Sequence, residues 1–177
     1  MRVISGYLKG LNFDSPKNYK IHPMSEKIRG SLFNTLGDIE GLTLLDTFSG
    51  SGSLSYEAIS RGAKQCVAID VSKLAVENIK LNCKKLDIGE KLEVYKSTIA
   101  TWSINNQDKI FDLIIADPPY NDTQILQLNK LGSHLKKSGT LVLSWPGKLE
   151  PINLIDLKVV KYKNYGDSQL VFYHKIS

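Results

Sequence analysis

The four-residue stretch Asp117-Pro118-Pro119-Tyr120 combines residue types that could do chemistry together. A carboxylate accepts hydrogen bonds, a proline pair presents carbonyl groups on a stiff frame, and a tyrosine ring can stack on a planar ligand. The stretch follows an apolar run at 111–116 that is typical of a buried parallel strand, and open α/β sheets bind ligands where such strands end. At about 5% proline usage, roughly one chain in a thousand of this length contains the tetrapeptide by accident. The alternative is structural, an acidic residue that ends a strand before a Pro-Pro turn.

A second candidate site is the glycine-rich stretch Asp46-Thr47-Phe48-Ser49-Gly50-Ser51-Gly52, which links an apolar run to a helical pattern. Its glycines let the backbone approach a ligand closely. Dinucleotide enzymes, P-loop enzymes and simple tight turns share this pattern. However, no Gly-Lys-[Ser/Thr] follows, and Ser55 stands where a dinucleotide fingerprint has its third Gly or Ala. We expect Asp46 at the mouth of the turn, where a carboxylate would repel a pyrophosphate and favour a cationic ligand.

A third carboxylate, Asp70, ends the next apolar run, 18 residues after Gly52. At that place it can accept hydrogen bonds from both ribose hydroxyls of an adenosine that lies across the strand ends. The alternative for Asp70 is the N-cap of a helix that begins at residue 71. A ligand with a ribose, an ammonium and a positive sulfonium, but no phosphate, fits the three carboxylates and the glycines together. That ligand is S-adenosylmethionine.

The elements that must position these residues alternate between strands and helices. Apolar runs predict buried strands at 42–46, 66–70, 92–95, 111–116 and 140–145, and helical patterns separate them at 53–62, 71–86 and 123–137. In the helix at 71–86, the inward candidates are Leu74, Ile79 and Leu86. Runs at 157–162 and 169–173 are joined by a connection too short for a helix and must pair antiparallel. The sequence therefore predicts a Rossmann-like α/β fold: a mostly parallel sheet with helices on both faces, closed by a C-terminal antiparallel hairpin.

The N-terminal part differs from this pattern. Residues 1–20 alternate short apolar runs with turn residues, which predicts a small β-hairpin outside the main core. Pro23 is expected to open a helix that stops at Gly37. We therefore divide the chain into a hairpin extension, 1–20, and a main domain, 21–177.

Composition limits the classes of function. The chain has 177 residues, 42% of them hydrophobic, which is enough for one domain with a sizeable core. No apolar run is long enough to span a bilayer, and residues 1–6 lack the apolar region of a secretory signal. Cys66 and Cys83 have no CxxC pattern or nearby histidine, so we interpret both as reduced, packed thiols of a cytoplasmic protein and expect no metal site. The net charge of +5 is mild; the basic residues within 1–29 could bind phosphates or form a solvated face.

Three ordered motifs resemble those of class I S-adenosylmethionine-dependent amino-methyltransferases: Asp46-x-Phe48-x-Gly50-x-Gly52, Asp70, and Asp117-Pro118-Pro119-Tyr120. More narrowly, the chain resembles the RsmD family. The residues that carry this narrower match are Arg2-Val3-Ile4-Ser5-Gly6-x-x-Lys9-Gly10 and Pro23-Met24-Ser25-Glu26-Lys27-Ile28-Arg29-Gly30-Ser31-Leu32-Phe33-Asn34. The resemblance implies a seven-stranded sheet and methylation of the exocyclic N2 amine of a guanine in 16S ribosomal RNA, the family's guanine-966 site. It also implies a monomer that acts on a small-subunit assembly intermediate.

The resemblance assigns roles to particular residues. Asp117 and the carbonyl of Pro118 are the expected acceptors for the amine, within the catalytic stretch 117–120, and Tyr120 is expected to stack on the extruded base. Given an RNA substrate, the residues expected beside phosphates are Arg2, Lys9 and Arg29.

The chain also departs from the family pattern. His22-Pro23-Met24 replaces the usual Arg-Pro-Thr, and Gly30 replaces an acidic residue. Thr98 and Ile99, expected at the cofactor, stand where an amide or acid and an alanine are usual. This change puts in doubt a side-chain hydrogen bond to the adenine amine, although Ile99 could still pack against the ring.

Three other functions remain open on the sequence alone. An adenine-N6 DNA methyltransferase also uses an Asp-Pro-Pro-Tyr turn, but this chain lacks a separate target-recognition domain. The same fold also serves small-molecule or protein methyltransferases. A non-catalytic module that binds nucleotide or RNA would have no need of the acceptor set at 117–120.

Overall fold

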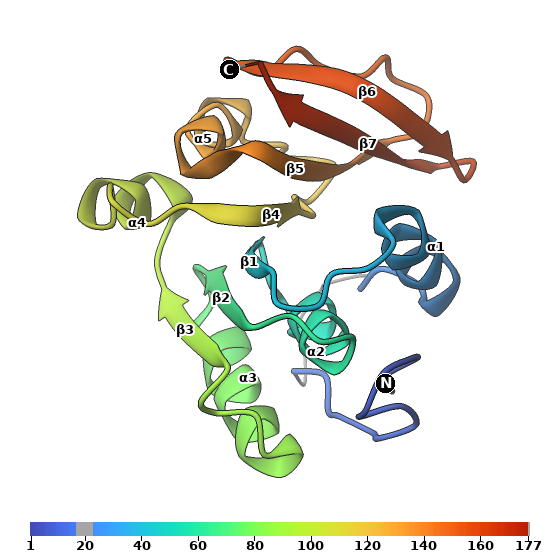
Figure 1. Cartoon of the computed structure of the whole chain (residues 1–177), viewed down its shortest axis with the longest axis vertical. Helices are drawn as coiled ribbons and strands as arrows, with labels where there is room; N and C mark the ends of the chain where they lie inside the picture. The colour runs from blue at the N-terminus through green and yellow to red at the C-terminus, as the bar shows by residue number, and fades with distance from the viewer. Residues whose placement is uncertain (17–22, 177) are drawn as a thin grey trace.

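The computed structural model describes residues 1–16 and 23–176. Its centre is a seven-stranded sheet in the order β3-β2-β1-β4-β5-β7-β6 (Figure 1). The strands are β1 (Thr43–Thr47), β2 (Gln65–Asp70), β3 (Leu92–Lys96), β4 (Phe111–Ala116), β5 (Leu135–Pro146), β6 (Leu157–Asn164) and β7 (Ser168–Lys175). Strands β1 to β5 pair in parallel, whereas β7 runs antiparallel between β5 and β6. The predicted parallel core and its terminal antiparallel hairpin are confirmed.

Helices cover both faces of this sheet. They are α1 (Glu26–Leu36), α2 (Ser53–Ser60), α3 (Lys73–Leu86), α4 (Ile99–Asn105), α5 (Ile125–Leu128) and a short 3-10 helix, η1 (Leu131–His134). One buried cluster joins α1, α2 and α3 to the sheet, and a second joins α4, α5 and η1 to it (Figure 1). Consecutive strand residues alternate between the two clusters, as Leu44 and Leu45 do in β1. This alternation follows from the two-residue period of a strand and explains why the strands are apolar on both sides.

Local capping sets where the helices begin. Ser25 caps α1, Ser72 caps α3 and Thr98 caps α4, each by accepting a hydrogen bond from a backbone N–H in the first turn. Helix α1 therefore starts at Glu26 rather than at Pro23, and it ends as predicted before Gly37, which has a φ of 78°.

Three predicted details of the helices are wrong. Leu74, expected to face inward, is 54% exposed, whereas Ile79 and Leu86 are buried. The sequence did not predict α4. The helix expected over 123–137 is reduced to α5 and η1, because the chain from Leu135 onward joins the sheet. Leu135 pairs with Phe111 of β4 and is buried, so strand pairing outweighs the local helical preference of this segment.

The N-terminal segment packs into the core instead of lying outside it. Within residues 1–16 a single antiparallel bridge joins Arg2 and Asn12, so the predicted hairpin is reduced to one bridge and its turn. Val3, Leu8 and Phe13 are buried in the cluster that α2 also joins, and the segment lies beside α2 in Figure 1. The predicted domain boundary between residues 20 and 21, and the departure at His22, lie outside the described residues.

Two further expectations concern the cysteines and the membrane. Cys66 and Cys83 are free, buried thiols, as predicted. In the part of the chain that the structure describes, the helices are too short or too polar to cross a bilayer.

Candidate active site

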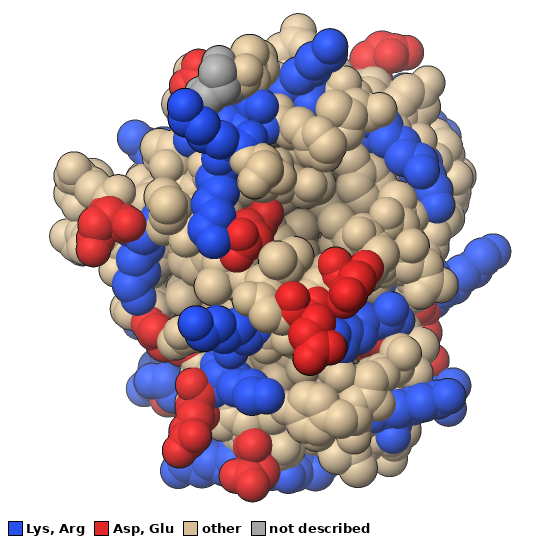
Figure 2. Space-filling model, in the orientation of Figure 1, with Lys and Arg blue, Asp and Glu red and all other residues tan. Residues whose placement is uncertain are grey.

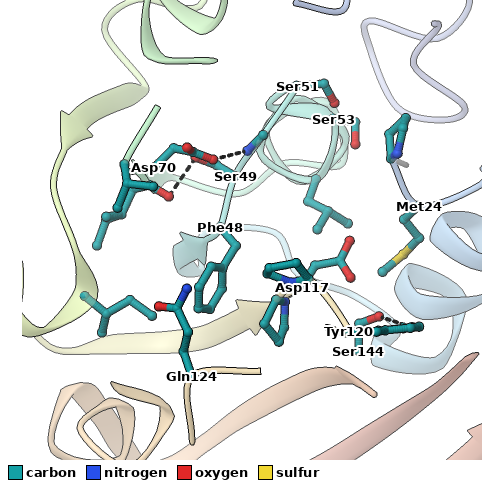
Figure 3. A pocket seen from close by; sticks show the side chains of 18 of the residues that line it. Met24, Phe48, Ser49, Ser51, Ser53, Asp70, Asp117, Tyr120, Gln124 and Ser144 are labelled. Carbon is teal, nitrogen blue, oxygen red and sulfur yellow. Dashed lines mark hydrogen bonds between the residues drawn. The ribbon is translucent and has the colours of Figure 1, made fainter. Parts of the chain in front are cut away.

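A cavity of about 820 Å³ opens at the carboxyl edge of the sheet (Figure 3). The strand order β2-β1-β4-β5 sets four functional segments side by side along this edge. Asp70 ends β2, the glycine turn follows β1, Asp117 follows β4, and Ser144 lies near the end of β5. Because neighbouring strands lie about 4.8 Å apart, Asp70 and Asp117 are separated by roughly 10 Å across the edge. The two carboxylates therefore share one cavity, as the sequence predicted.

The glycine turn is held by Asp70. The Gly50 N–H donates to one carboxylate oxygen of Asp70 at 2.8 Å, and the Ser72 N–H donates to the other at 2.8 Å. Asp70 is thus not the N-cap of α3, which is Ser72. Its oxygens line the cavity while they fix the turn, and each oxygen can accept more than one hydrogen bond.

The turn itself requires unusual backbone angles. Phe48 has a φ of 61° and Gly50 a φ of 51°, both in the left-handed region that L side chains rarely adopt. A bulky non-glycine residue held there is strained, and such strain is often found at ligand sites. This backbone directs the ring of Phe48 into the middle of the cavity (Figure 3).

Gly52 is closely packed against neighbouring side chains. It has a φ of 80° at the start of α2 and does not line the cavity. A Cβ atom at this position would lie 2.5 Å from the hydroxyl oxygen of Tyr56. Only glycine therefore fits here, and the contact of Gly52 with the cofactor stays a prediction.

Asp46 was predicted to stand at the mouth of the turn, but the structure places it elsewhere. It is fully buried and absent from the cavity lining, and its carboxylate accepts a hydrogen bond from the Ser55 hydroxyl at 2.7 Å. Burial, the main cause, raises the pKa of Asp46 to about 7, and the nearby charges of Asp117 and Asp70 add to the rise. Asp46 is therefore a buried acidic group behind the cavity wall, and it does not present its carboxylate to the cavity as the sequence predicted.

One half of the cavity has an apolar wall. Its apolar lining is Phe48, Ile69, Val71 and Ile99. Thr98 also lines this half, but its hydroxyl caps α4: it accepts from the Thr101 N–H at 3.0 Å and donates to the Thr101 hydroxyl at 3.0 Å.

The other half of the cavity contains the Asp-Pro-Pro-Tyr turn. The Asp117 N–H donates to the Thr47 carbonyl at 3.4 Å, which continues the pairing of β4 with β1 and aims the side chain into the cavity. In Figure 3 the Asp117 carboxylate points toward the side where Met24 lies. Burial raises the pKa of Asp117, and a hydrogen bond from Ser144 offsets part of that rise. The Tyr120 ring is 41% exposed, and its hydroxyl lies 2.9 Å from the Ser144 hydroxyl.

The prediction that Arg29 lies beside RNA phosphates is wrong. Its side chain is fully buried, its guanidinium lies 3.7 Å from the Glu57 carboxylate, and it donates to the Arg2 carbonyl at 2.8 Å. Glu57, also buried, accepts from the backbone N–H groups of Ile4 and Ser5 at 2.8 and 3.1 Å. The buried pair ties the N-terminal segment to α1 and α2.

Arg2 and Lys9 are exposed, as a phosphate contact requires. Arg2 forms an ion pair with Glu26 at 3.2 Å on the surface, and exposed pairs of this kind are worth about 0–1 kcal/mol, so a phosphate could compete for the guanidinium. On the face of the molecule drawn in Figure 2, Lys and Arg side chains are spread among Asp and Glu side chains rather than gathered in one patch.

The charge of the cavity lining restricts its ligand. Among the described residues that line it, Asp70 and Asp117 are acidic and none is Lys, Arg or His. A phosphate would find no cationic partner there, whereas an ammonium or sulfonium group would be attracted. The described residues also contain no group of three or more His, Cys, Asp or Glu side chains that could hold a metal ion.

Several lining residues were missed by the sequence analysis. Ser144 lies in a strand that the sequence predicted. Its position near the carboxyl end of that strand was the signal that could have placed it at the site. Other missed residues are Met24 and Ile28, which lie just before and within α1, and Gln124 and Gln127, which lie in the segment wrongly predicted as a long helix.

Comparisons with known proteins agree with this geometry. A family model described as "Conserved hypothetical protein 95" matches residues 1–174. YlbH of Bacillus subtilis, a candidate rRNA methyltransferase, is 31% identical over 99% of both chains. Ribosomal RNA small subunit methyltransferase D of Buchnera aphidicola is 34% identical over 67% of this chain and 62% of its own length.

A solved structure supports the fold. That of yhhF from Escherichia coli, a candidate methyltransferase, has a TM-score of 0.83 at 22% identity and covers 99% of this chain and 97% of its own. Since the family model spans nearly the whole chain, and relatives at 30% identity or more accompany it, this chain belongs to the RsmD family of class I methyltransferases.

Proposed function

We propose that this protein transfers a methyl group from S-adenosylmethionine to the exocyclic N2 amine of a guanine in small-subunit ribosomal RNA. The observation that carries the proposal is the shared cavity: two carboxylates on separate strand ends, an apolar wall and no cationic lining residue. Such a cavity suits a phosphate-free cation beside a planar amine. The names of the Buchnera and Bacillus relatives support ribosomal RNA as the substrate class.

The residues present fit the cofactor. Asp70 would accept hydrogen bonds from the ribose hydroxyls, and the backbone around Gly50 would lie against the amino acid part. Phe48 and Ile99 would pack against the adenine ring. With the Thr98 hydroxyl engaged in capping α4, the adenine amine is left to other acceptors. When bound, the cofactor supplies an electrophilic methyl group on a positive sulfur.

The chain's own groups would prepare the nucleophile. The lone pair of a guanine amine is delocalised into the ring, so the nitrogen attacks poorly. If Asp117 and the Pro118 carbonyl accept its two hydrogens, a pyramidal nitrogen is favoured and the lone pair turns toward the methyl group. The new N–C bond would form as the S–C bond breaks, and the amine would then lose one proton, for which the Asp117 carboxylate is the proposed acceptor.

Tyr120 would form one wall of the base site. Its ring lines the cavity and remains partly exposed, so an extruded base could stack on it. Much of the rate acceleration would then come from holding amine and methyl group in line. No described residue is needed as a metal ligand for these steps.

The proposal extends to the setting of the reaction. The RsmD resemblance favours guanine 966 of 16S ribosomal RNA, an assembly intermediate of the small subunit as substrate, a monomeric enzyme and the cytoplasm. Exposed Arg2 and Lys9 are the candidates for contacts with RNA phosphates.

One experiment tests the substrate class and the target atom. The protein is incubated with S-adenosylmethionine labelled in its methyl group and with free 16S rRNA, assembled small subunits or duplex DNA. Labelled nucleosides are then separated after digestion. We expect N2-methylguanosine from a small-subunit substrate. Label in N6-methyladenine of DNA, or in protein, would replace the proposal by one of its rivals, and no transfer to any substrate would indicate a binding module.

A further inference from the structure

Gln124 extends into the cavity from the segment that follows the Asp-Pro-Pro-Tyr turn. Figure 3 shows its side chain reaching toward the ring of Phe48, which belongs to the apolar wall. The backbone of Gln124 has a φ of 51°, in the left-handed region that L side chains rarely adopt. Strain of this kind persists only where surrounding contacts hold it, and it is often found at ligand sites. Gln124 is therefore a candidate ligand contact in the apolar half of the cavity.

Two hydrogen bonds in series, here called the amide relay, fix which way the Gln124 amide faces. The Ala100 N–H at the start of α4 donates to the side-chain oxygen of Gln127 at 3.3 Å. The NH2 group of Gln127 donates in turn to the side-chain oxygen of Gln124. Because a backbone N–H can only donate, Gln127 must turn its oxygen toward α4 and its NH2 group toward Gln124. Gln124 must therefore present its oxygen toward Gln127 and its NH2 group on the other side.

The Gln124 amide keeps unused hydrogen-bonding capacity. Its oxygen accepts one bond from Gln127 and has a second lone pair. Its NH2 group has one long contact, 3.4 Å to the exposed side chain of Asp122, where an asparagine oxygen could accept equally well. The second hydrogen of that NH2 group remains available. One acceptor and one donor therefore stand side by side at the cavity, on an amide whose orientation is fixed.

This pair of groups matches the edge of an adenine ring. Adenine carries its amine, a donor, next to ring nitrogen N1, an acceptor, and a glutamine amide can bind a donor and an acceptor of adenine at once. Hypoxanthine, which has a carbonyl in place of the amine and a hydrogen on N1, presents the opposite pattern. To bind hypoxanthine, the Gln124 amide would have to turn over, which would bring its NH2 group against that of Gln127. The amide relay therefore favours adenine over hypoxanthine.

We propose that Gln124 recognises the adenine of S-adenosylmethionine, and that Gln127 is a positioning residue that holds the Gln124 amide in the orientation adenine requires. The inference rests on the proposed function, because that function supplies the cofactor. It deepens that function by naming an acceptor for the adenine amine, which the Thr98 hydroxyl does not supply. The acceptor comes from the segment after β4 rather than from the segment after β3.

The test measures binding without turnover. Calorimetry gives the Kd values of S-adenosylhomocysteine and of its hypoxanthine counterpart, S-inosylhomocysteine, for the wild type and for each variant. For the wild type we expect about tenfold tighter binding of the adenine compound, the equivalent of one hydrogen bond. Gln124→Ala should remove most of this preference. Gln107→Ala, the matched control, should keep it, because Gln107 lies just after α4 and does not line the cavity.

A second variant tests the direction of the amide relay. Gln127→Glu can still accept from the Ala100 N–H, but its carboxylate has no hydrogen to donate to Gln124. The Gln124 amide should then turn its NH2 group toward residue 127, which reverses the pattern that it presents to the cavity. The preference for S-adenosylhomocysteine should therefore vanish or invert in favour of S-inosylhomocysteine.

The outcomes separate this inference from the proposed function. A wild type that binds neither compound would overturn the proposed function. A wild type that binds both compounds equally, or a preference that persists in Gln124→Ala, would overturn the role of Gln124 while the proposed function stands. A preference that is lost in Gln124→Ala but unchanged in Gln127→Glu would overturn the positioning role of Gln127.

Discussion

Replacement of Asp117 by asparagine probes the proposed chemistry most directly. The amide has the shape of the carboxylate but no charge, so the geometry of the turn should persist. A hydrogen bond to a charged group contributes about 1.5–3 kcal/mol, and every 1.36 kcal/mol in the barrier is about tenfold in rate. We therefore expect kcat for Asp117→Asn to fall by about 10- to 150-fold. Because Asp70 lies across the cavity, the Kd for S-adenosylmethionine should stay unchanged.

The pH dependence gives an independent reading of the same group. Burial raises the pKa of Asp117, and only the ionised form can accept hydrogen bonds from an amine. Wild-type activity should then fall as the pH drops through this raised pKa. Asp117→Asn should lack that limb, whereas a limb due to Asp46, whose pKa is raised to about 7, would persist in the variant.

The assay is single-turnover methyl transfer to the small-subunit substrate, with cofactor binding measured by calorimetry. Asp122→Asn is the matched control, because Asp122 follows the same turn but does not line the cavity. Turnover of Asp117→Asn within twofold of the wild type would refute the acceptor role. So would an equal loss in Asp122→Asn, since the effect would then not depend on the cavity.

Three further predictions concern the cofactor, the fold and the RNA. Asp70→Asn should weaken S-adenosylmethionine binding, measured by calorimetry, with a smaller effect on kcat. The reason is that an amide has only one acceptor oxygen and cannot accept from both the Gly50 N–H of the glycine turn and the Ser72 N–H. Unchanged affinity would remove Asp70 from the cofactor site. Glu57→Ala should lower the free energy of unfolding by about 3–5 kcal/mol, since it leaves the buried Arg29 charge unpaired. Urea denaturation should show that adding Arg29→Met recovers part of this loss. Full stability of the Glu57→Ala variant would contradict the pairing. The double variant Arg2→Ala, Lys9→Ala should reduce the slope of log KM for RNA against log salt by about one unit per lost phosphate contact, and parallel slopes would discount these two residues.

The sequence alone determined the order of the elements and the edge at which the site forms. Strand periodicity, glycines and prolines act over a few residues, so they can be interpreted without the rest of the chain. That is why the Asp117 turn, the glycine turn and Asp70 could be assigned to strand ends, and why the terminal hairpin was predicted as antiparallel. Parallel strands in turn bring their carboxyl ends to one edge, which made the meeting of Asp70 and Asp117 predictable.

Only the tertiary structure decided which polar groups face the cavity and which are buried. Arg29 has the sequence character of a phosphate-binding residue, but Glu57 from a distant helix holds it in the core. Asp46 turns behind the wall, toward Ser55. Ser144 acquires its place because β5 pairs with β4, and the same pairing converts the end of a helical pattern at Leu135 into strand. Burial and partner choice depend on contacts between segments far apart in the chain, and local residue patterns do not contain them.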